Sequence, residues 1–397
     1  MTDGLITGAK AVLPDKVLEN AAVLIKNGLI EAVLENETLA GPPAEYKCRL
    51  DLNGDYLLPG FIDIHVHGAG GADVMDKDAS ALARLAQSLL QQGTIAFLAT
   101  TMSSPIKDLD ETLQRVWAAK KKNFSETPGA EILGAHLEGP FLSLEYKGAH
   151  AAKYIYPPND KNEEAAIVKN LAAKYPGLIR ILTLAPERPG FESLAQICRQ
   201  ENIILSAGHS QADYPAMRRA AAKGVAHVTH AFNAMPPIHH RAPGLLTEAL
   251  LNNNLTLELI ADGVHIHPAV LKLAFRAKPL RKIIIISDGT RAAGMPDGSY
   301  DLGGQTAKVV KGVATLADGT LAGSAFSLLE AVRTLAQKLN MTLPSVANYL
   351  CANPAKALSV DDRLGSIAPG KEASFVRLDE KLRLKQVWLR GKTVVSG

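Results

Sequence analysis

Short apolar runs alternate with helix-like stretches through most of the chain, from about residue 58 to residue 355. Eight of these runs have the length and composition of buried strands, and they start at residues 60, 93, 131, 178, 202, 226, 255 and 282. Stretches between them, such as ASALARLAQSLLQQ (79–92), carry helical patterning. Eight strand and helix units in succession predict an α/β fold, a TIM-like (β/α)8 barrel. An open doubly wound sheet is disfavoured because no GxGxxG turn follows the first run.

The two ends of the chain have a different pattern. Residues 4–58 contain short strand-like runs, and AAVLIKNGLIEAVL (21–34) places an Asn-Gly turn between two of them, which is a strong hairpin signal. The C-terminal stretch SFVRLDEKLRLKQVWLRGKTVV (374–395) also resembles strands joined by a turn. We therefore predict a small β-sandwich domain made of residues 1–58 and 356–397, and a barrel domain made of residues 59–355.

Two stretches are too long for the loops of a minimal barrel. Residues 142–164 form a polar segment after the third strand, and residues 291–324 form a segment rich in Gly and Asp after the eighth. The second segment resembles an inserted hairpin. Long loops inside a compact domain often carry function.

Ionisable side chains stand at the ends of the predicted strands. The first strand ends in HVH, and His65 and His67 would point to the same face because side chains two residues apart in a strand do so. The other strands contribute Glu138, His209, His230, His265 and Asp288. The carboxyl ends of the strands of a (β/α)8 barrel form one rim, where active sites lie. We therefore predict that these residues converge.

The surroundings of two of these residues point to a metal ion. Glu138 follows the apolar EILGAHL and Asp288 follows KIIIIS, and a buried carboxylate without a partner is unfavourable. A divalent ion would relieve this cost. Histidine and carboxylate ligands suit Zn²⁺ best, and Fe²⁺ or another divalent ion would also fit. A single histidine such as His209 or His230 is more often a hydrogen-bonded core residue, so the prediction depends on the whole set.

The remaining histidines have other expected places. His136 precedes Glu138 by two residues, so it shares that strand face and could orient a ligand. His227 precedes His230 by three residues, an odd offset, so we expect it to face the other way and to be structural. Surface positions are expected for His239 and His240, in a polar loop, and for His267, at a helix start.

Composition and the termini argue against several classes of protein. The 43 basic and 40 acidic residues give a net charge of +3 without a basic block, so nucleic-acid binding is not expected. No apolar run approaches the roughly 18 residues of a membrane span, and MTDGLITGAK does not begin like a signal peptide. The three cysteines are far apart, which indicates no disulfide framework. We expect a cytoplasmic protein.

The motifs resemble those of a known family. LPGFIDIHVHG (58–68) resembles the first-strand signature of the amidohydrolase superfamily. Further along, HLEGPF, KGAH, SAGHS, THAFNAM, RAPG, ADGVH, SDG and LAGS together resemble the N-acetylglucosamine-6-phosphate deacetylases. The resemblance continues into the C-terminal NPAKALSVDDRLGSIAPGKEASFV (353–376). It therefore covers nearly the whole chain.

The resemblance implies a reaction and a catalytic set. The family deacetylates N-acetyl-D-glucosamine 6-phosphate to D-glucosamine 6-phosphate and acetate, in amino-sugar catabolism and cell-wall recycling. Transferred to this sequence, the main metal ion would be bound by Glu138, His209 and His230. Asp288 would be the acid and base, and His150 of KGAH would contact the substrate near the scissile carbonyl.

The resemblance also implies how the substrate is bound. The phosphate end would be held by Asn233, Ala234, Arg241 and His265, and further substrate contacts would come from Ala149, Asp262, Leu321, Ala322 and Gly323. In the family, the arginine at the position of Arg241 reaches in from a neighbouring subunit. A homodimer is therefore implied.

One departure from the wider superfamily bears on the number of ions. Many amidohydrolases bridge two metals with a carboxylated lysine after the fourth strand, but LIRILTLAPE (178–187) has no lysine. Glu138 is the expected replacement. Some members of the family have Gln and Asn in place of the two strand-one histidines. This chain keeps His65 and His67, so a second ion is expected there, giving one or two ions in all.

Two alternatives stay open. The first is a different amidohydrolase activity, either deacetylation of N-acetylgalactosamine 6-phosphate or ring opening like that of a dihydroorotase, which the missing lysine disfavours. The second is a barrel that has lost activity and serves as a binding subunit. The complete set of Glu138, His209, His230 and Asp288 argues against the second alternative.

Overall fold

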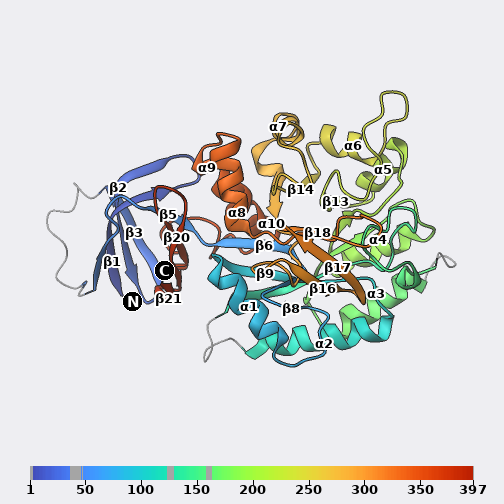
Figure 1. The fold of residues 1–397 in the computed structure, drawn as a ribbon, viewed down its shortest axis with the longest axis horizontal. Coiled ribbons are helices and arrows are strands. Elements are labelled where there is room, and N and C mark those ends of the chain that lie inside the picture. The colour runs from blue at the N-terminus through green and yellow to red at the C-terminus, as the bar shows by residue number, and fades with distance from the viewer. Residues whose placement is uncertain (1–2, 36–45, 47, 123–128, 158–162, 397) are drawn as a thin grey trace.

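A parallel sheet curves into a barrel, on the right of Figure 1. The computed structural model describes residues 3–35, 46, 48–122, 129–157 and 163–396. Within these residues, eight strands follow one another around the barrel in chain order: β6 (Phe61–Val66), β9 (Thr94–Thr101), β10 (Glu131–Glu138), β11 (Ile179–Leu184), β12 (Ile204–Ala207), β13 (Val225–Val228), β14 (Thr256–Ile260) and β15 (Ile283–Ile286). The predicted barrel is confirmed.

The barrel closes where its first strand meets its last. A parallel bridge joins Val66 to Gly289. The backbone N–H of His67 donates to the carbonyl of Gly289 at 2.8 Å, and the N–H of Asp288 donates to the carbonyl of His65 at 3.0 Å. Closure therefore places the HVH stretch directly beside Asp288.

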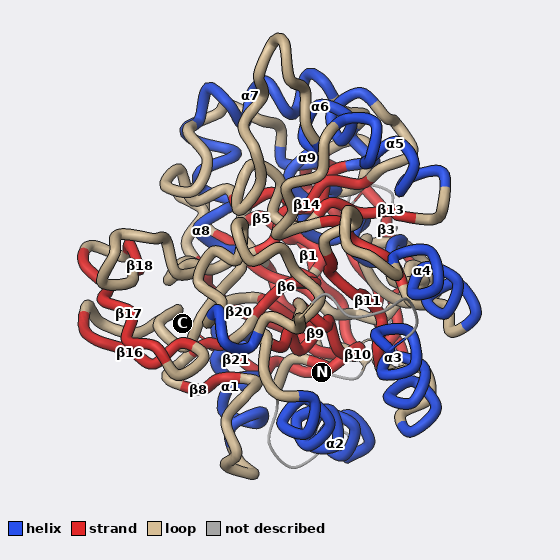
Figure 2. Tube along the Cα trace, turned by 90° about the vertical axis from the view of Figure 1, so that its right-hand side faces the viewer, coloured by secondary structure: helices blue, strands red, loops and turns tan. Residues whose placement is uncertain are grey.

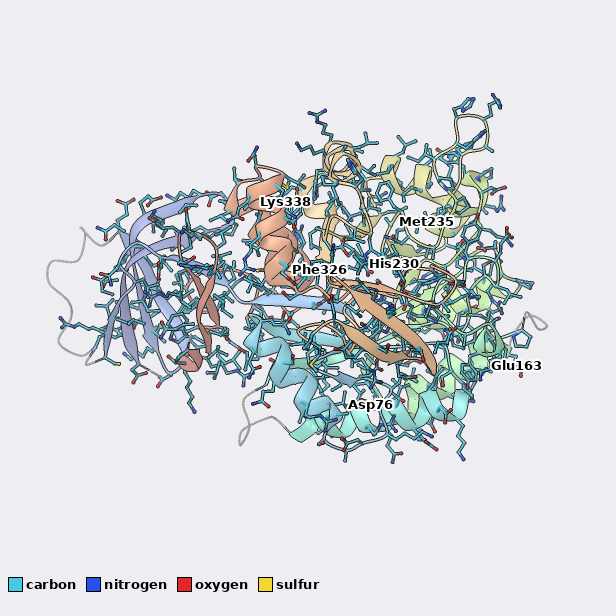
Figure 3. The ribbon with its side chains drawn as sticks, in the orientation of Figure 1. Asp76, Glu163, His230, Met235, Phe326 and Lys338 are labelled. Carbon is cyan, nitrogen blue, oxygen red and sulfur yellow. The ribbon has the colours of Figure 1, made fainter. Side chains whose placement is uncertain are left out.

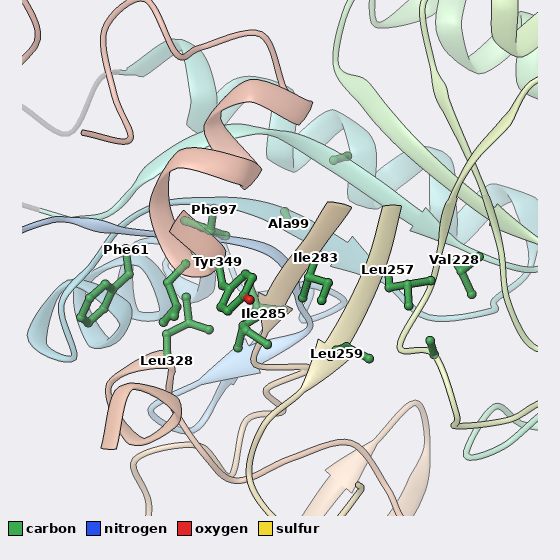
Figure 4. Packing of buried hydrophobic residues seen from close by; sticks show 14 of the residues in the cluster. Phe61, Phe97, Ala99, Val228, Leu257, Leu259, Ile283, Ile285, Leu328 and Tyr349 are labelled. Carbon is green, nitrogen blue, oxygen red and sulfur yellow. The ribbon is translucent and has the colours of Figure 1, made fainter. Parts of the chain in front are cut away.

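The barrel strands are buried on both faces, apart from the exposed Ala226 of β13, as continuous apolar runs predict. In β15, Ile283 and Ile285 join the cluster that Figure 4 shows, together with Leu328 of a covering helix. Ile284 and Ile286 join a second hydrophobic cluster on the other face. Alternate side chains of one strand thus pack into two different cores.

Helices cover the outside of the barrel, as Figure 2 shows for α2 to α5. Their bounds are α1 (Ala81–Gln91), α2 (Ile106–Lys122), α3 (Glu163–Lys174), α4 (Phe191–Gln200), α5 (Tyr214–Ala222), α6 (Leu245–Leu251), α7 (Pro268–Ala277), α8 (Leu328–Arg333), α9 (Leu343–Ala347) and α10 (Asn353–Ala357). Short helical turns are η2 (Ala152–Tyr154), η3 (Leu280–Lys282), η4 (Thr334–Lys338) and η5 (Asn348–Ala352).

Side chains cap several helix starts: Asp213, for example, accepts from the N–H of Ala216 at 2.7 Å. No helix of the described residues is both long and apolar enough to cross a membrane.

Strands from both chain ends form a second eight-stranded sheet, on the left of Figure 1. Its order is β21 (Lys392–Ser396), β20 (Leu384–Leu389), β19 (Phe375–Leu378), β5 (Tyr56–Pro59), β1 (Gly4–Val12), β2 (Val17–Lys26) and β3 (Leu29–Glu35), with β4 (Arg49–Asp51) paired to β1. Asn27 and Gly28 turn between β2 and β3 with φ of 53° and 76°, as the hairpin prediction requires.

The terminal sheet has a hydrophobic cluster of its own. Phe375 and Trp388 from the C-terminal strands pack in it with Ile6 and Val23 from the N-terminal ones. The prediction of a β-unit built from both termini is therefore confirmed. The domain boundaries at residues 58/59 and 355/356 stay a prediction.

The segment predicted as an inserted hairpin is a three-stranded antiparallel sheet. Its strands are β16 (Gly298–Leu302), β17 (Gln305–Val310) and β18 (Val313–Thr315), and they stand apart from the barrel in Figure 2. A smaller hairpin, β7 (Gly68–Ala69) and β8 (Ala72–Asp73), follows the HVH stretch. Part of the other long segment, residues 158–162, lies outside the described residues.

Candidate active site

A cavity of about 480 Å³ opens at the rim formed by the carboxyl ends of the barrel strands. Twelve of the predicted residues line it: His67, Glu138, Ala149, His150, His209, His230, Asn233, Ala234, His265, Asp288, Leu321 and Gly323. His65 and Asp262 lie behind these residues and contact them, and Ala322 is buried in the neighbouring hydrophobic cluster. The structure thus brings together all the predicted residues except Arg241.

The backbone turns sharply where three of these side chains enter the cavity. His209, His230 and Asp288 each stand two residues beyond the end of their strand. They have positive φ angles of 47°, 29° and 49°, which residues other than glycine rarely adopt. Such strained conformations gather at functional sites. Figure 3 labels His230, which lies within the barrel body.

Glu138 lies between two pairs of histidines. Its Oε1 is 3.1 Å from Nε2 of His209 and 3.0 Å from Nε2 of His230. Its Oε2 is 3.1 Å from Nε2 of His67 and 3.5 Å from Nε2 of His65. All five side chains are buried. Each carboxylate oxygen therefore faces its own pair of imidazole nitrogens.

The first pair fits a divalent ion by its spacing and its hydrogen bonds. The Nε2 atoms of His209 and His230 lie 3.0 Å apart, close to the separation of about 3.3 Å between ligands held at about 2.0 Å in a tetrahedral site. Nδ1 of His209 lies 2.9 Å from the carbonyl of Tyr146. Because only an N–H can satisfy a carbonyl, Nε2 keeps its lone pair for a metal.

The second pair offers a similar opening. Nε2 of His65 has no hydrogen-bond partner among the described residues, and it lies 3.5 Å from Oδ1 of Asp288. Nε2 of His67 is 3.4 Å from the same oxygen. Donor atoms of His65, His67 and Glu138 all lie within 4.8 Å of one another. The buried histidines and Glu138 together could hold a divalent metal ion.

The charges of this cluster favour a cation. Burial lowers the pKa of His67, but hydrogen bonds to Asp288 and Glu138 and the charges of both outweigh it and raise this pKa to about 9. Burial also acts to raise the pKa of Asp288, yet the hydrogen bond from His67 and the charge of His65 hold that pKa well below its usual range. Burial also acts to raise the pKa of Glu138, but the charge of His65 holds it well below its usual range. Both carboxylates are therefore ionised, and their field attracts positive charge.

His150 presents an N–H to the cavity. The backbone N–H of Ser103 donates to its Nδ1 at 3.1 Å, so Nδ1 is an acceptor and the proton of the neutral ring is on Nε2. Burial lowers the pKa of His150 to about 4, which keeps the ring neutral at pH 7. Nε2 lies 3.4 Å from Oε2 of Glu138. Gln305 of β17 secures this segment by donating to the carbonyl of Ala149 at 2.6 Å.

The residues predicted for the phosphate end lie in two places. Asn233, Ala234 and His265 line the cavity, and Ala234 sits in a turn with a φ of 50°. Nδ1 of His265 lies 2.6 Å from Oδ2 of Asp262. Arg241 is exposed on the loop between β13 and α6 and is not among the residues that line the cavity of its own chain.

The structure corrects one prediction about the other histidines. His227 does not face away from the barrel interior: its Nδ1 lies 3.9 Å from Oε1 of Glu258, whose Oε2 contacts His65. β13 ends at Val228 and the chain then turns, so strand alternation does not extend from His227 to His230.

The remaining histidine predictions agree with the structure. The ring of His136 packs edge-on against that of His65, with centroids 4.6 Å apart, and its Nε2 lies 2.7 Å from Oγ1 of Thr183. His136 therefore supports the site by packing against His65. His239, His240 and His267 are exposed, and His267 caps the start of α7.

Several residues of the site were not predicted. Glu258 is fully buried beneath it, and the only signal in the sequence is a carboxylate inside the apolar run LTLELIAD. Tyr146, Lys147, Leu302 and Thr320 also line the cavity. These four come from the two long segments after the third and eighth strands, whose length alone indicated function.

Comparisons with known proteins agree with this geometry. The model of the amidohydrolase family matches residues 56–394. The N-acetylglucosamine-6-phosphate deacetylase of Bacillus subtilis (strain 168) is 40% identical over 375 residues, which cover 94% of this chain and 92% of that protein. The N-acetylgalactosamine-6-phosphate deacetylase of Escherichia coli O157:H7 is 37% identical, over 86% of this chain and 88% of its own. A crystal structure of N-acetylglucosamine-6-phosphate deacetylase from Pasteurella multocida superposes with a TM-score of 0.90 at 29% identity and covers 100% of both chains. The chain therefore belongs to the amidohydrolase family and, within it, to the same group as these sugar-phosphate deacetylases.

Proposed function

We propose that this protein hydrolyses the N-acetyl group of N-acetyl-D-glucosamine 6-phosphate, giving D-glucosamine 6-phosphate and acetate. The observation that carries the proposal is the place of Glu138, between two histidine pairs and beside an ionised Asp288. The cavity of about 480 Å³ is in the range that small-molecule ligands occupy. The named relatives support the choice of substrate.

We assign the main metal ion to Glu138, His209 and His230, because their donor atoms already converge. A second ion would be held by His65 and His67, with Glu138 between the two. Zn²⁺ suits this donor set best, and Fe²⁺ would fit the same residues. When bound, a divalent ion polarises the amide carbonyl and lowers the pKa of water to about 7.

Asp288 is the proton carrier in this proposal. Its carboxylate is ionised and lines the cavity, so it can accept the proton of the attacking water. It then gives that proton to the departing nitrogen, which must leave as an amine. One carboxylate can do both because the two transfers are consecutive.

In this proposal His150 is the hydrogen-bond donor to the acetyl oxygen. Its Nε2–H points into the cavity on the side of Glu138. An N–H there can donate to the acetyl oxygen as negative charge develops on it. Because the ring is neutral and its tautomer is set by Ser103, the donor is in place before the substrate arrives.

The phosphate would be held by Asn233, Ala234 and His265 together with Arg241 from a second subunit. Arg241 is exposed on the loop between β13 and α6. A planar guanidinium matches phosphate oxygens in pairs. We therefore propose a homodimer in which each subunit completes the other's site.

We place the reaction in the cytoplasm, as part of amino-sugar catabolism and cell-wall recycling. The three cysteines are free, which fits a reducing compartment. Ring opening like that of a dihydroorotase has no support, because β11 (Ile179–Leu184) contains no lysine to bridge two metals.

N-acetyl-D-galactosamine 6-phosphate is a second candidate substrate, because one relative at 37% identity is named for it. Acetate release from both phosphorylated sugars and from unphosphorylated N-acetylglucosamine, with metal analysis of the same sample, separates the two candidates. We expect the highest kcat/KM for N-acetyl-D-glucosamine 6-phosphate, and loss of activity with a chelator. A higher kcat/KM for N-acetyl-D-galactosamine 6-phosphate would make that sugar the substrate. If none of the three sugars released acetate, deacetylation would be excluded.

A further inference from the structure

Glu258 is a buried carboxylate that the proposed reaction does not use. It lies in the middle of β14 and is 0% exposed. Leu257 and Leu259 on either side pack into the large hydrophobic cluster, so strand alternation turns Glu258 to the opposite face, toward the barrel interior. Its Oε1 has no hydrogen-bond partner among the described residues. A buried charge with so few partners is unfavourable unless it compensates another group.

The nearest partner of Glu258 is His65, since Nδ1 of His227 lies farther away, 3.9 Å from Oε1 of Glu258. Oε2 of Glu258 lies 3.2 Å from Nδ1 of His65, while Nε2 of the same ring faces Glu138 and Asp288 at 3.5 Å each. A neutral imidazole has one N–H and a carboxylate only accepts. The contact with Glu258 is the shorter one, so it favours the proton on Nδ1, and a metal ion at the rim would then take the lone pair of Nε2.

We propose that Glu258 is a positioning residue, which holds His65 in the tautomer and ring orientation that binding of the second metal ion requires. This inference rests on the proposed ion at His65 and His67. Carboxylates that accept from the outer N–H of a ligand histidine orient the ring and strengthen metal binding. Glu258 would act in this way from below, without touching the substrate.

The packing around His65 leaves this task to Glu258. His136 meets the ring edge-on, with an interplanar angle of 76°, but its own nitrogens lie near Thr183 Oγ1 and the carbonyl of Ile64. His136 can therefore limit the tilt of the ring without choosing its tautomer. Glu258 faces Nδ1 directly and can fix both.

Zn²⁺ titration of the metal-free full-length protein against a chromogenic chelator tests the proposal. Glu258→Gln keeps the size of the side chain and removes its charge. In this variant we expect the second site, at His65 and His67, to lose about 10–100-fold in affinity. The affinity of the site at Glu138, His209 and His230 should change little. His65→Gln should lose the second ion completely. Glu248→Gln is the matched control, because Glu248 is also buried (6% exposed) but lies on α6 and pairs with Asn252. It should keep both affinities.

A second readout separates orientation from general stability. ¹⁵N spectra of histidine-labelled protein, with the His65 signals assigned from His65→Gln, report which ring nitrogen carries the proton. We expect a protonated Nδ1 in the wild type and a changed proton distribution in Glu258→Gln, which a purely structural role would not produce. If Glu258→Gln does not fold, Glu258→Asp withdraws the oxygen by one methylene and should show the same selective loss.

The failures of the two proposals differ. A wild-type protein that binds one ion in total would overturn the second ion, and with it the role given to Glu258. Two ions in both the wild type and Glu258→Gln, with equal affinities and an unchanged His65 signal, would overturn the role of Glu258 alone.

Discussion

The backbone N–H of Ser103 donates a hydrogen bond to Nδ1 of His150 at 3.1 Å, and this contact decides which nitrogen of the ring can serve the substrate. Nε2 must carry the proton. We expect His150→Ala to lower kcat by about 10²–10³-fold, the usual effect of removing one oxyanion donor, with a smaller change in KM. His150→Gln can return an N–H near the position of Nε2 and should recover part of kcat. Equal losses in the two variants would argue against donation from Nε2.

Asp288 carries the proton transfers in this account, and Asp288→Asn removes its ability to accept a proton while keeping its shape. We expect acetate release to fall by about 10²–10⁴-fold, with the fold intact. Steady-state rates would be read beside the bound metal content and the midpoint of thermal unfolding. Near-normal turnover in a protein with its full metal content would remove Asp288 from this role.

Arg241 is expected to act across subunits. Arg241→Ala should raise KM for the phosphorylated sugar and leave kcat/KM for unphosphorylated N-acetylglucosamine unchanged, because only the phosphate needs the guanidinium. Arg241→Lys keeps the charge but not the planar fork, so its KM should lie between those of the wild type and Arg241→Ala. An unchanged KM would take Arg241 out of the phosphate site.

Mixing two impaired variants, assayed at a substrate concentration well below the raised KM of Arg241→Ala, tests the dimer itself. A heterodimer of Arg241→Ala and Asp288→Asn subunits would contain one site with both defects and one site with neither. Activity should therefore reappear when the two proteins are unfolded and refolded together. If no activity returns although heterodimers form, Arg241 does not serve the partner's site.

The pair of Asp262 and His265 predicts a pH dependence of substrate binding. Burial lowers the pKa of His265, but the hydrogen bond to Asp262 and its charge outweigh burial and raise this pKa above its ordinary value of 6.5. The imidazolium can then bind phosphate at neutral pH, so KM should stay low below the raised pKa and increase as the pH passes it. Asp262→Asn can still accept from the backbone N–H groups of Val264 and His265 but has no charge. The KM of Asp262→Asn should begin to increase at a lower pH than that of the wild type. If KM depended on pH in the same way in both proteins, the role given to the pair of Asp262 and His265 would be contradicted.

The sequence was sufficient to predict the rim of the barrel. Residues that end a strand, or stand two positions beyond its end, come together in any parallel barrel. Glu138, His209, His230 and Asp288 all occupy such positions, so their convergence follows from strand order alone. The HVH stretch joins them because the first and last strands meet at the barrel's closure.

Other features depend on contacts that no local pattern encodes. Glu258 meets His65 across 193 positions of the chain, and a single carboxylate in an apolar run does not name its partner. His227 was misplaced because the backbone turns immediately after β13 and interrupts the alternation. The tautomer of His150 depends on a backbone N–H from a different loop, which no side-chain motif reveals.

Acetate release from N-acetyl-D-glucosamine 6-phosphate, followed while Zn²⁺ is added to metal-free protein, tests most directly whether the ion at Glu138, His209 and His230 is what deacetylation needs. We expect no acetate before metal is added, a rate that increases in proportion to the first equivalent, and no recovery in His230→Ala at the same metal concentration. Full activity of the metal-free protein, or no acetate at any metal content, would contradict the assignment.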